Sequence, residues 1–187
     1  MQLVKDRATE YARKVVSGEV VAGLPHIRAC QRHLNDIKKS QTEPDYPYVW
    51  NPSLSERIIN YAETLTIVEG QAPKQVQLYE CQCFDIGVPF GWVTKEGFRR
   101  FRRSYKSMAR QNGKTFQNGI TGSYIAGFSG YQYGKLFTVA TKKRQARLAW
   151  EEISKFIKSD PDLAEIFKVQ DYKSMITATQ TMCTIEA

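Results

Sequence analysis

The chain has 187 residues, 42% of them hydrophobic and 25% charged, a composition that is typical of a soluble globular protein and excludes a disordered chain. The apolar stretches are far shorter than a bilayer span, and charged residues interrupt residues 1–16, where a signal peptide needs an apolar core. We therefore expect a cytoplasmic protein of one domain, or of one domain with a helical extension, without a membrane partner. The net charge of +8 suits a polyanionic partner such as DNA.

The cysteines and histidines do not form a metal-binding pattern. Two of the four cysteines make one C-x-C pair and the other two stand alone, whereas a structural zinc site usually takes two paired clusters. Four reduced cysteines are expected. His26 and His33 are interpreted as ordinary surface or boundary residues of a helix, because no acidic or thiol partner has ligand spacing.

Two amphipathic helices are predicted at the N-terminus, over Leu3 to Ser17 and Leu24 to Lys39, because apolar residues recur there at helical spacing. The polar, proline-containing stretch "KKSQTEPDYPYVWNP" follows and is typical of a linker, so a domain boundary is expected within it. A third helix is predicted to begin at Ser53, with Glu56 completing a capping box and Gly70 lying past its end.

The middle of the chain is predicted to alternate between helices and strands. A helix from about Lys74 to Ile86 is expected to end at "GVPFGWV". A strand in "RFRRSYK" then leads through the loop "SMARQNG" into the helix "KTFQNGITGSYIAGF". The many glycines of that helix would weaken it by up to about 1 kcal/mol each if it were exposed, so they predict close packing on a sheet.

Alternating elements continue to the end of the sequence. "KLFTVAT" is predicted to be a short buried strand, "KKRQARLAWEEISKFIKSD" an amphipathic helix, "PDLAEIF" a helical turn and "KSMITATQTMCTIEA" a strand. Strand, loop, helix and strand in this order make a βαβ unit, which gives a parallel sheet. The predicted fold class is therefore α/β, with a parallel sheet flanked by helices.

The loop before the glycine-rich helix ends in Gly113, Lys114 and Thr115, as a phosphate-binding loop does. In such a site the positive N-terminal end of the helix faces the phosphates, Lys114 reaches the β and γ oxygens, and the Thr115 hydroxyl ligates Mg²⁺. Arg110, inside the loop, would add a planar charged group beside the γ-phosphate. The alternative is a strand-to-helix turn that is capped by Gly113, with Arg110 solvated.

The stretch "ARQNGKT" resembles the variant Walker A loop of tailed-bacteriophage terminase large subunits, which typically carries an arginine and often lacks the first glycine, here replaced by Met108. "YVWNPSLSERIINYAETLTIVEG" resembles the helix upstream of that family's motor core. "LYECQCFDIGVPFGWV" is similar to its L-x-x-x-Q segment and Phe-Gly-Trp stretch, and "FTVATKKRQARLAWEEISKFI" to the strand, Gln-Ala pair and helix after the loop. The resemblance covers about residues 46–187.

The resemblance implies ATP and Mg²⁺ as cofactors. The implied nucleotide-binding residues are Gln82, Arg110, Gln111, Asn112, Gly113, Lys114 and Thr115. Gln82 corresponds to the glutamine that reads the adenine edge, for which a side-chain amide offers both a donor and an acceptor. Arg110 and Lys114 are expected to serve catalysis, and Thr115 to ligate the metal.

The resemblance also implies partners. Complete members of this family are ATP-driven motors that translocate and cleave concatemeric viral DNA in the cytoplasm of the infected bacterium. Expected partners are therefore double-stranded DNA without sequence preference, the small terminase subunit, the portal protein and further copies of the chain. The basic cluster Lys142, Lys143, Arg144 and Arg147 is interpreted as a contact for DNA or for a neighbouring subunit's nucleotide, or else as a solvated helix face.

The family's Walker B motif, an apolar run followed by Asp-Glu, has no counterpart, because the chain contains no Asp-Glu dipeptide. The C-terminal nuclease domain also has none. We therefore expect an incomplete P-loop NTPase: residues 1–45 as a helical extension and linker, and residues 46–187 as the N-terminal part of the ATPase domain, from a fragment, a split gene or a truncated product. Alone, such a chain is expected to be nearly inactive as an ATPase.

Two other functions are compatible with these residues. Another nucleic-acid P-loop ATPase, such as a helicase, would share the loop, but helicases seldom combine an arginine in the loop with a Phe-Gly-Trp stretch. A non-enzymatic module would bind DNA, the small terminase subunit or the portal without turning over nucleotide. A measurement of ATP hydrolysis separates these classes.

Overall fold

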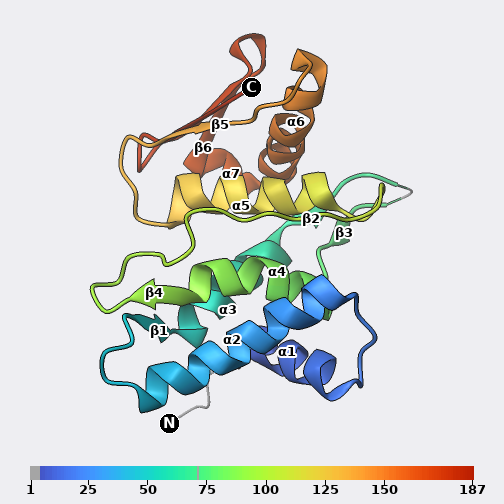
Figure 1. Ribbon diagram of the computed structural model, residues 1–187. Helices are drawn as coiled ribbons and strands as arrows, with labels where there is room; N and C mark the ends of the chain where they lie inside the picture. Colours follow the sequence, from blue (N-terminus) through green and yellow to red (C-terminus); the bar gives the residue numbers. More distant parts are fainter. Residues whose placement is uncertain (1–4, 71) are drawn as a thin grey trace. The chain divides into compact units, whose positions relative to one another are not determined.

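The computed structural model describes residues 5–70 and 72–187 and divides the chain into two compact units. The first contains the residues up to Asn60 together with Leu78–Lys106, and the second contains Tyr61–Gln77 and Ser107–Ala187. The described residues form a mixed α/β structure with seven α-helices and three small sheets (Figure 1). None of these helices is both long and apolar enough to cross a membrane. The domain boundary expected after residue 45 stays a prediction.

The first unit is mainly helical. Its elements are α1 (Arg7–Ser17), α2 (Leu24–Thr42), β1 (Tyr48–Trp50), the start of α3 (Pro52–Thr64), α4 (Glu80–Gly91) and β4 (Trp92–Thr94). Helix α1 packs against both α2 and α4, and β1 pairs with β4 in an antiparallel ribbon. The buried core of this unit consists of Ala8, Tyr11, Ala12, Val15, Cys30, Phe84, Val88 and Trp92.

The two predicted N-terminal helices are confirmed, with different ends. Helix α1 begins at Arg7 because the Asp6 carboxylate accepts a hydrogen bond from the Thr9 N–H at 3.1 Å, and it ends at Gly18, which adopts a φ of 85°. The predicted start at Leu3 lies outside the described residues. Helix α2 runs three residues further than predicted, to Thr42.

The predicted start of α3 is wrong by one residue, and the capping box is wrong. Helix α3 begins at Pro52, where Asn51 Oδ1 accepts a hydrogen bond from the Leu54 N–H at 3.2 Å. Glu56 instead accepts hydrogen bonds from the backbone N–H of Arg7 at 2.8 Å and from its Nε at 2.9 Å. Glu56, which was predicted to cap its own helix, thus binds the first residue of α1 instead.

Helix α4 corrects the prediction of a helix over residues 74–86. Lys74 and Gln75 form a short strand, and the helix runs from Glu80 to Gly91, through Pro89 and the predicted break. An added Cβ would lie 2.4 Å from Ser55 Oγ at Gly87, and 2.3 Å from a ring carbon of Trp50 at Gly91. The glycines that indicated a break are thus places where neighbouring atoms approach the helix backbone closely.

His33 is buried, with 2% of its surface exposed, so its interpretation as a surface or boundary residue is wrong. The indole N–H of Trp92 donates to His33 Nδ1 at 2.9 Å, and His33 Nε2 lies 2.9 Å from the Thr9 hydroxyl oxygen. Because an indole N–H only donates, Nδ1 must be the acceptor, and Nε2 carries the proton that it donates to Thr9. The neutral ring therefore joins α1, α2 and β4.

Acidification is expected to destabilise the first unit through this ring. Burial lowers the pKa of His33 to about 4, although the charges of Asp6 and Asp36 oppose the shift and those of Arg100 and Arg13 add to it. Because the unfolded chain binds the proton near pH 6.5, the stabilisation is complete above that pH and is lost as the pH falls towards 4. Urea unfolding across this window should show a loss of up to about 3 kcal/mol.

The control for this prediction compares pH slopes rather than absolute stabilities. In His33→Gln the slope between pH 6.5 and 4 should flatten, because the titrating ring is gone, whereas His26→Gln should keep it. An unchanged slope in His33→Gln would show that other groups, such as the carboxylates, cause the acid sensitivity.

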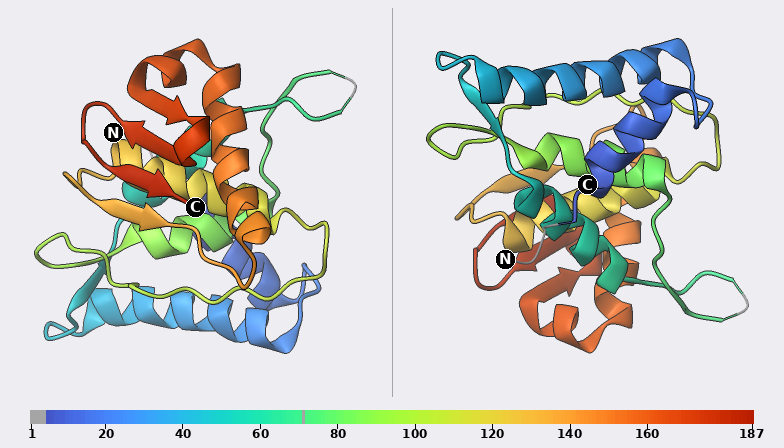
Figure 2. Two further views of the ribbon diagram at one scale, coloured as in Figure 1. Left: turned by 90° about the horizontal axis from the view of Figure 1, so that it is seen from above. Right: turned by 90° about the horizontal axis from the view of Figure 1, so that it is seen from below.

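The second unit carries a four-stranded sheet. Its elements are the end of α3, β2 (Thr66–Ile67), β3 (Lys74–Gln75), α5 (Lys114–Phe128), β5 (Lys135–Phe137), α6 (Lys143–Ser159), α7 (Pro161–Ile166), β6 (Phe167–Gln170), the 3₁₀-helix η1 (Asp171–Lys173), β7 (Met175–Ala178) and β8 (Thr184–Glu186). The strand order is β5-β8-β7-β6. Helices α5 and α6 pack against each other, and each contacts this sheet (Figure 2).

The sheet is mixed rather than parallel. Only β5 and β8 are parallel, and the β8–β7 and β7–β6 pairs are antiparallel. The predicted strand at the C-terminus is two strands, β7 and β8, joined by a turn.

The strand predicted in "RFRRSYK" is wrong, since residues 101–109, all of them described, form no strand. Five of residues 99–106 are Arg or Lys. A strand that is covered on both faces of a parallel sheet is a nearly continuous run of apolar residues, so this segment does not have the composition of such a strand.

The glycines of α5 explain how the second unit packs. An added Cβ would lie 3.0 Å from the Phe156 ring at Gly119, 3.1 Å from Ile153 at Gly122, and 2.6 Å from the Phe167 ring at Gly127. The first two neighbours belong to α6 and the third to β6. The prediction of close packing is confirmed, but helix α6 takes as much part in it as the sheet does.

Candidate nucleotide site

The loop that precedes α5 has the backbone shape of a tight turn into a helix. Gln111 and Gly113 have φ values of 63° and 74°, in the left-handed region. Glycine adopts this conformation at little cost, so Gly113 is suited to its place directly before the first helical residue. These two residues turn the chain from residues 107–109 into α5 within the second unit.

Lys114 folds back over this loop. Its ammonium group donates to the backbone carbonyls of Met108 at 2.6 Å and Ala109 at 2.8 Å. The Asn112 side chain also donates to the carbonyl of Arg110 at 3.1 Å, which closes the loop further. A full positive charge is thus held within the loop by neutral acceptors, which an incoming anion can replace.

The N-terminal end of α5 favours an anion. No side chain caps this end, and its first backbone N–H groups point along the helix axis out of the N-terminus. The 15-residue helix carries a partial positive charge there. Together with the ammonium of Lys114, these donors make a suitable place for phosphate oxygens.

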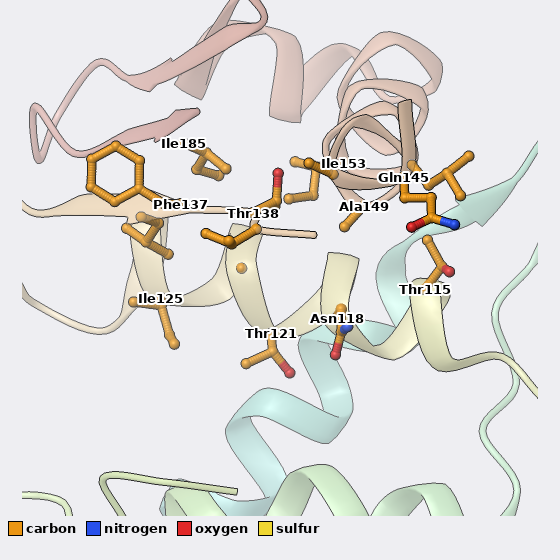
Figure 3. A pocket seen from close by; sticks show the side chains of 15 residues that line it. Thr115, Asn118, Thr121, Ile125, Phe137, Thr138, Gln145, Ala149, Ile153 and Ile185 are labelled. Carbon is orange, nitrogen blue, oxygen red and sulfur yellow. The ribbon is translucent and has the colours of Figure 1, made fainter. Parts of the chain in front are cut away.

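A groove of about 420 Å³ runs along α5 from Thr115 and is closed by residues of β5, α6 and β8 (Figure 3). Thr115, Asn118 and Thr121 lie on the α5 side, and Gln145 lies across from Thr115 (Figure 3). The Gln145 side-chain oxygen accepts a hydrogen bond from the Thr141 hydroxyl at 3.2 Å. The predicted magnesium ligand therefore faces a polar end of this groove.

Sequence reasoning missed Asn118 and Thr121. Their spacing from Thr115, three and six residues, places all three on one face of α5, so a helical projection of the sequence would have grouped them. The end of the groove away from Thr115 is lined mainly by apolar side chains, among them Ile125 and Ile185, and the Thr138 side chain lies between the two ends (Figure 3).

The donor set fits a magnesium ion that is bound together with phosphates. Among the described residues no group of three or more His, Cys, Asp or Glu side chains could hold a metal. Mg²⁺ commonly keeps several waters and takes few protein ligands plus phosphate oxygens, so the Thr115 hydroxyl is compatible with it. Glu152 packs against Gly119, one turn after Thr115, where burial raises its pKa and the nearby Lys155 opposes that rise.

The remaining predicted residues lie on the loop, at the start of α6 and, for Gln82, in the first unit. Arg110, Gln111 and Asn112 are exposed on the loop itself. In the basic cluster, Arg147 Nε lies 3.5 Å from Glu151, and the guanidinium group of Arg147 lies over the Trp150 ring at 5.7 Å. The other three members of the cluster, at the start of α6, are exposed.

Gln82 belongs to the first unit, in the first turn of α4. Its side-chain oxygen accepts a hydrogen bond from the Tyr79 N–H at 3.0 Å. A carboxamide oxygen has a second lone pair, and the NH₂ group carries two donors, so adenine recognition is compatible with this bond. That Gln82 meets the loop's nucleotide stays a prediction.

Comparisons with known proteins identify the family. A search of curated proteins finds no match. The crystal structure of the bacteriophage HK97 large terminase matches 71% of this chain and 26% of its own, with 22% sequence identity and a TM-score of 0.60, which shows a shared fold. The chain thus spans about a quarter of that protein. A family model described as the terminase large subunit ATPase domain matches residues 80–185, more than half of the chain, so this protein belongs to that family.

Proposed function

We propose that this chain binds ATP with Mg²⁺ as part of a DNA-packaging motor. The observation that carries this proposal is the position of the Lys114 ammonium, which is held over the loop at the uncapped N-terminus of α5 by two backbone carbonyls. On binding, the β and γ phosphate oxygens would replace these carbonyls as its partners. Membership of a family of ATPase domains supports this assignment.

The other roles that we propose are those that the resemblance implies, and the positions of these residues are compatible with them. The Thr115 hydroxyl would ligate Mg²⁺, and the backbone N–H groups of Gln111, Asn112 and Gly113 would contact the phosphates. Arg110 is exposed and free of ion pairs within the described residues, so its guanidinium group could reach a γ-phosphate. The chemistry that Mg²⁺ would supply there is the offset of the negative charge of the phosphates.

Removal of the Thr115 hydroxyl tests the metal site. Thr115→Val keeps the shape of the side chain, and we expect it to weaken ATP binding about fivefold or more in the presence of Mg²⁺ but hardly at all in EDTA. Isothermal titration calorimetry measures both affinities, and Thr177→Val, the same substitution on β7 outside the groove, is the control. Equal losses with and without Mg²⁺ would place the hydroxyl on the phosphate rather than on the metal.

The family membership also supports partners for the complete motor. We propose that the protein works on double-stranded DNA with a small terminase subunit and a portal protein, as a ring of several copies, in the cytoplasm of an infected bacterium. In a complete motor, ATP hydrolysis would drive DNA translocation, and a nuclease would cut the concatemer. The membership favours this function over a helicase.

DNA binding is expected to be electrostatic. With a net charge of +8, the affinity for a duplex should fall at least tenfold between about 50 and 200 mM salt and should hardly differ among sequences, because phosphate contacts carry no base information. Fluorescence anisotropy with two unrelated duplexes measures this. If Lys142, Lys143 and Arg144 contact DNA, replacing all three by alanine should lower the salt slope by about two to three. Binding that does not depend on salt would count against the DNA proposal.

A further inference from the structure

The first unit contains a groove that nucleotide binding does not use. It has a volume of about 340 Å³ and lies between α2, α4 and residues 101–105. Its floor is formed by Ala29, Val88, Pro89 and Phe101, and its rim carries Arg32 and Arg103. The groove therefore combines an apolar floor with guanidinium groups at its edge.

The two arginines that line this groove, Arg32 and Arg103, have no acidic partner within residues 5–70 and 72–187. Both are exposed, as are Arg28, one turn earlier in α2, and Arg102, the neighbour of Arg103 in sequence, and neither of these forms an ion pair within the same residues. The one carboxylate that lines the groove, that of Asp85, is paired with Lys106. The rim therefore carries a net positive charge that is not balanced locally.

Arg100, in the same unit, is instead satisfied internally. Arg100 lies 2.7 Å from the Asp36 carboxylate, and its guanidinium group lies over the rings of Tyr48 and Trp92, at 4.5 and 5.0 Å. An arginine that serves the fold thus has a carboxylate and aromatic faces around it, whereas those on the rim have no carboxylate partner among the described residues.

The floor argues against nucleic acid as the occupant. Bases of single strands bind by stacking on free aromatic faces, but the Phe101 ring already has the guanidinium groups of Arg32 and Arg100 over it, at 5.5 and 5.0 Å. A duplex presents phosphates and sugars to a protein surface, and these gain nothing from Val88 and Pro89. A peptide with an apolar side chain between acidic residues would match both the apolar floor and the arginines on the rim.

We propose that this groove binds an acidic peptide segment of a partner protein, with one or two apolar side chains on the floor and carboxylates on the arginine rim. Arginine offers a planar fork that pairs with a carboxylate through two hydrogen bonds, and arginine and tyrosine are enriched at binding surfaces. Tyr105, which lines the groove and is 93% exposed, would close over the bound segment. The proposal is independent of the nucleotide site.

The test uses the whole chain and a fluorescein-labelled peptide in which two leucines are flanked by glutamates. Fluorescence anisotropy should show binding with a dissociation constant below about 1 mM. A peptide with the leucines replaced by serine keeps the charge and should bind at least about tenfold more weakly, because burial of the two side chains is lost. A peptide of the same composition with lysine in place of glutamate should not bind.

Variants locate the binding site. The double variant Arg32→Glu/Arg103→Glu should weaken binding of the leucine peptide at least about tenfold more than Arg57→Glu, which reverses one exposed charge of the same unit outside the groove. Arg103→Lys should retain part of the affinity, since it keeps the charge but loses the fork. Circular dichroism verifies that each variant is folded.

Three results would overturn the proposal. In the first, no binding of the leucine peptide is seen at low salt. In the second, both peptides bind equally well, which means that charge alone acts and the floor does not. In the third, oligo(dT) or a duplex binds more tightly than the peptide and loses more affinity in Arg32→Glu/Arg103→Glu than in Arg57→Glu, which would make the groove a nucleic-acid contact.

Discussion

Lys114→Ala is expected to abolish ATP–Mg²⁺ binding, with a loss of affinity of at least about a hundredfold. Lys114 supplies the full positive charge that the loop already holds, through hydrogen bonds to Met108 and Ala109 at 2.6 and 2.8 Å. Without it no ammonium group offsets the charge of the β and γ oxygens beside the N–H groups and the partial charge of the helix end. Isothermal titration calorimetry of the wild-type chain and the variant measures the effect directly.

A matched lysine serves as the control. Lys168 is exposed on β6 in the same unit, outside the groove that begins at Thr115, so Lys168→Ala should bind ATP as the wild type does. Lys114→Ala is also not expected to unfold the unit, because the lysine contacts only loop carbonyls and its loss leaves them open to water. Equal affinities of the wild type and Lys114→Ala would refute the nucleotide site.

The loop and several of the helices could be predicted because their signals are local. Gly113 and Lys114 stand next to each other in sequence, and the turn that they make depends on a few backbone angles. In α1 the stripe of Ala8, Tyr11 and Val15 recurs at helical spacing, and the same residues form the core. Local patterns of this kind do not depend on what packs against them.

The wrong predictions concern contacts between residues far apart in sequence. Gly87 and Gly91 were interpreted as a break in the helix. The helix is continuous there, and the two glycines allow the side chains of Ser55 and Trp50 to approach its backbone closely. His33 looked like a surface residue, but Thr9 and Trp92 bury it. In each case the contacting residue lies more than twenty residues away in the sequence, so a local sequence pattern cannot predict the contact.

The strand predicted before the loop failed for a related reason. Arg100 is committed to Asp36, and Lys106 is paired with Asp85, so side chains at both ends of the segment are held by the first unit. Between them Arg102 and Arg103 are exposed. The strand was predicted because a phosphate-binding loop follows a strand, but a segment with so many cations is not suited to the inside of a sheet.

The carboxylates of the second unit decide how much catalysis residues 1–187 can perform. Glu151 lies 3.5 Å from Arg147 Nε, and Glu152 lies 3.6 Å from Lys155, half-buried and with a raised pKa. The Glu186 carboxylate accepts a hydrogen bond from the Thr184 hydroxyl at 3.2 Å. Each of the three is thus engaged locally, and the chain has no Asp-Glu pair to hold the waters of Mg²⁺ or to orient an attacking water.

A polypeptide of residues 1–187 is therefore expected to bind ATP but to hydrolyse it at a rate near the uncatalysed one, because positioned phosphates and Mg²⁺ account for only part of the rate in this reaction. A longer polypeptide, or a second one, that supplies an apolar run ending in Asp-Glu should restore turnover. Release of phosphate measured with and without that partner tests this expectation. Lys114→Ala should remove any restored activity.

In the restored system Arg110→Ala is expected to lower kcat by about a thousandfold or more, with a smaller effect on KM, because an arginine that meets charge developing on the γ-phosphate acts mainly in the transition state. Arg57→Ala, an exposed arginine of the first unit, is the control and should leave kcat unchanged. A rise in KM with an unchanged kcat would mean that Arg110 only helps to bind ATP. Rapid hydrolysis by residues 1–187 alone that is lost in Lys114→Ala would refute the need for an added Asp-Glu pair. The candidate base would then be Glu152 of α6, which packs against Gly119, one turn after Thr115 on α5.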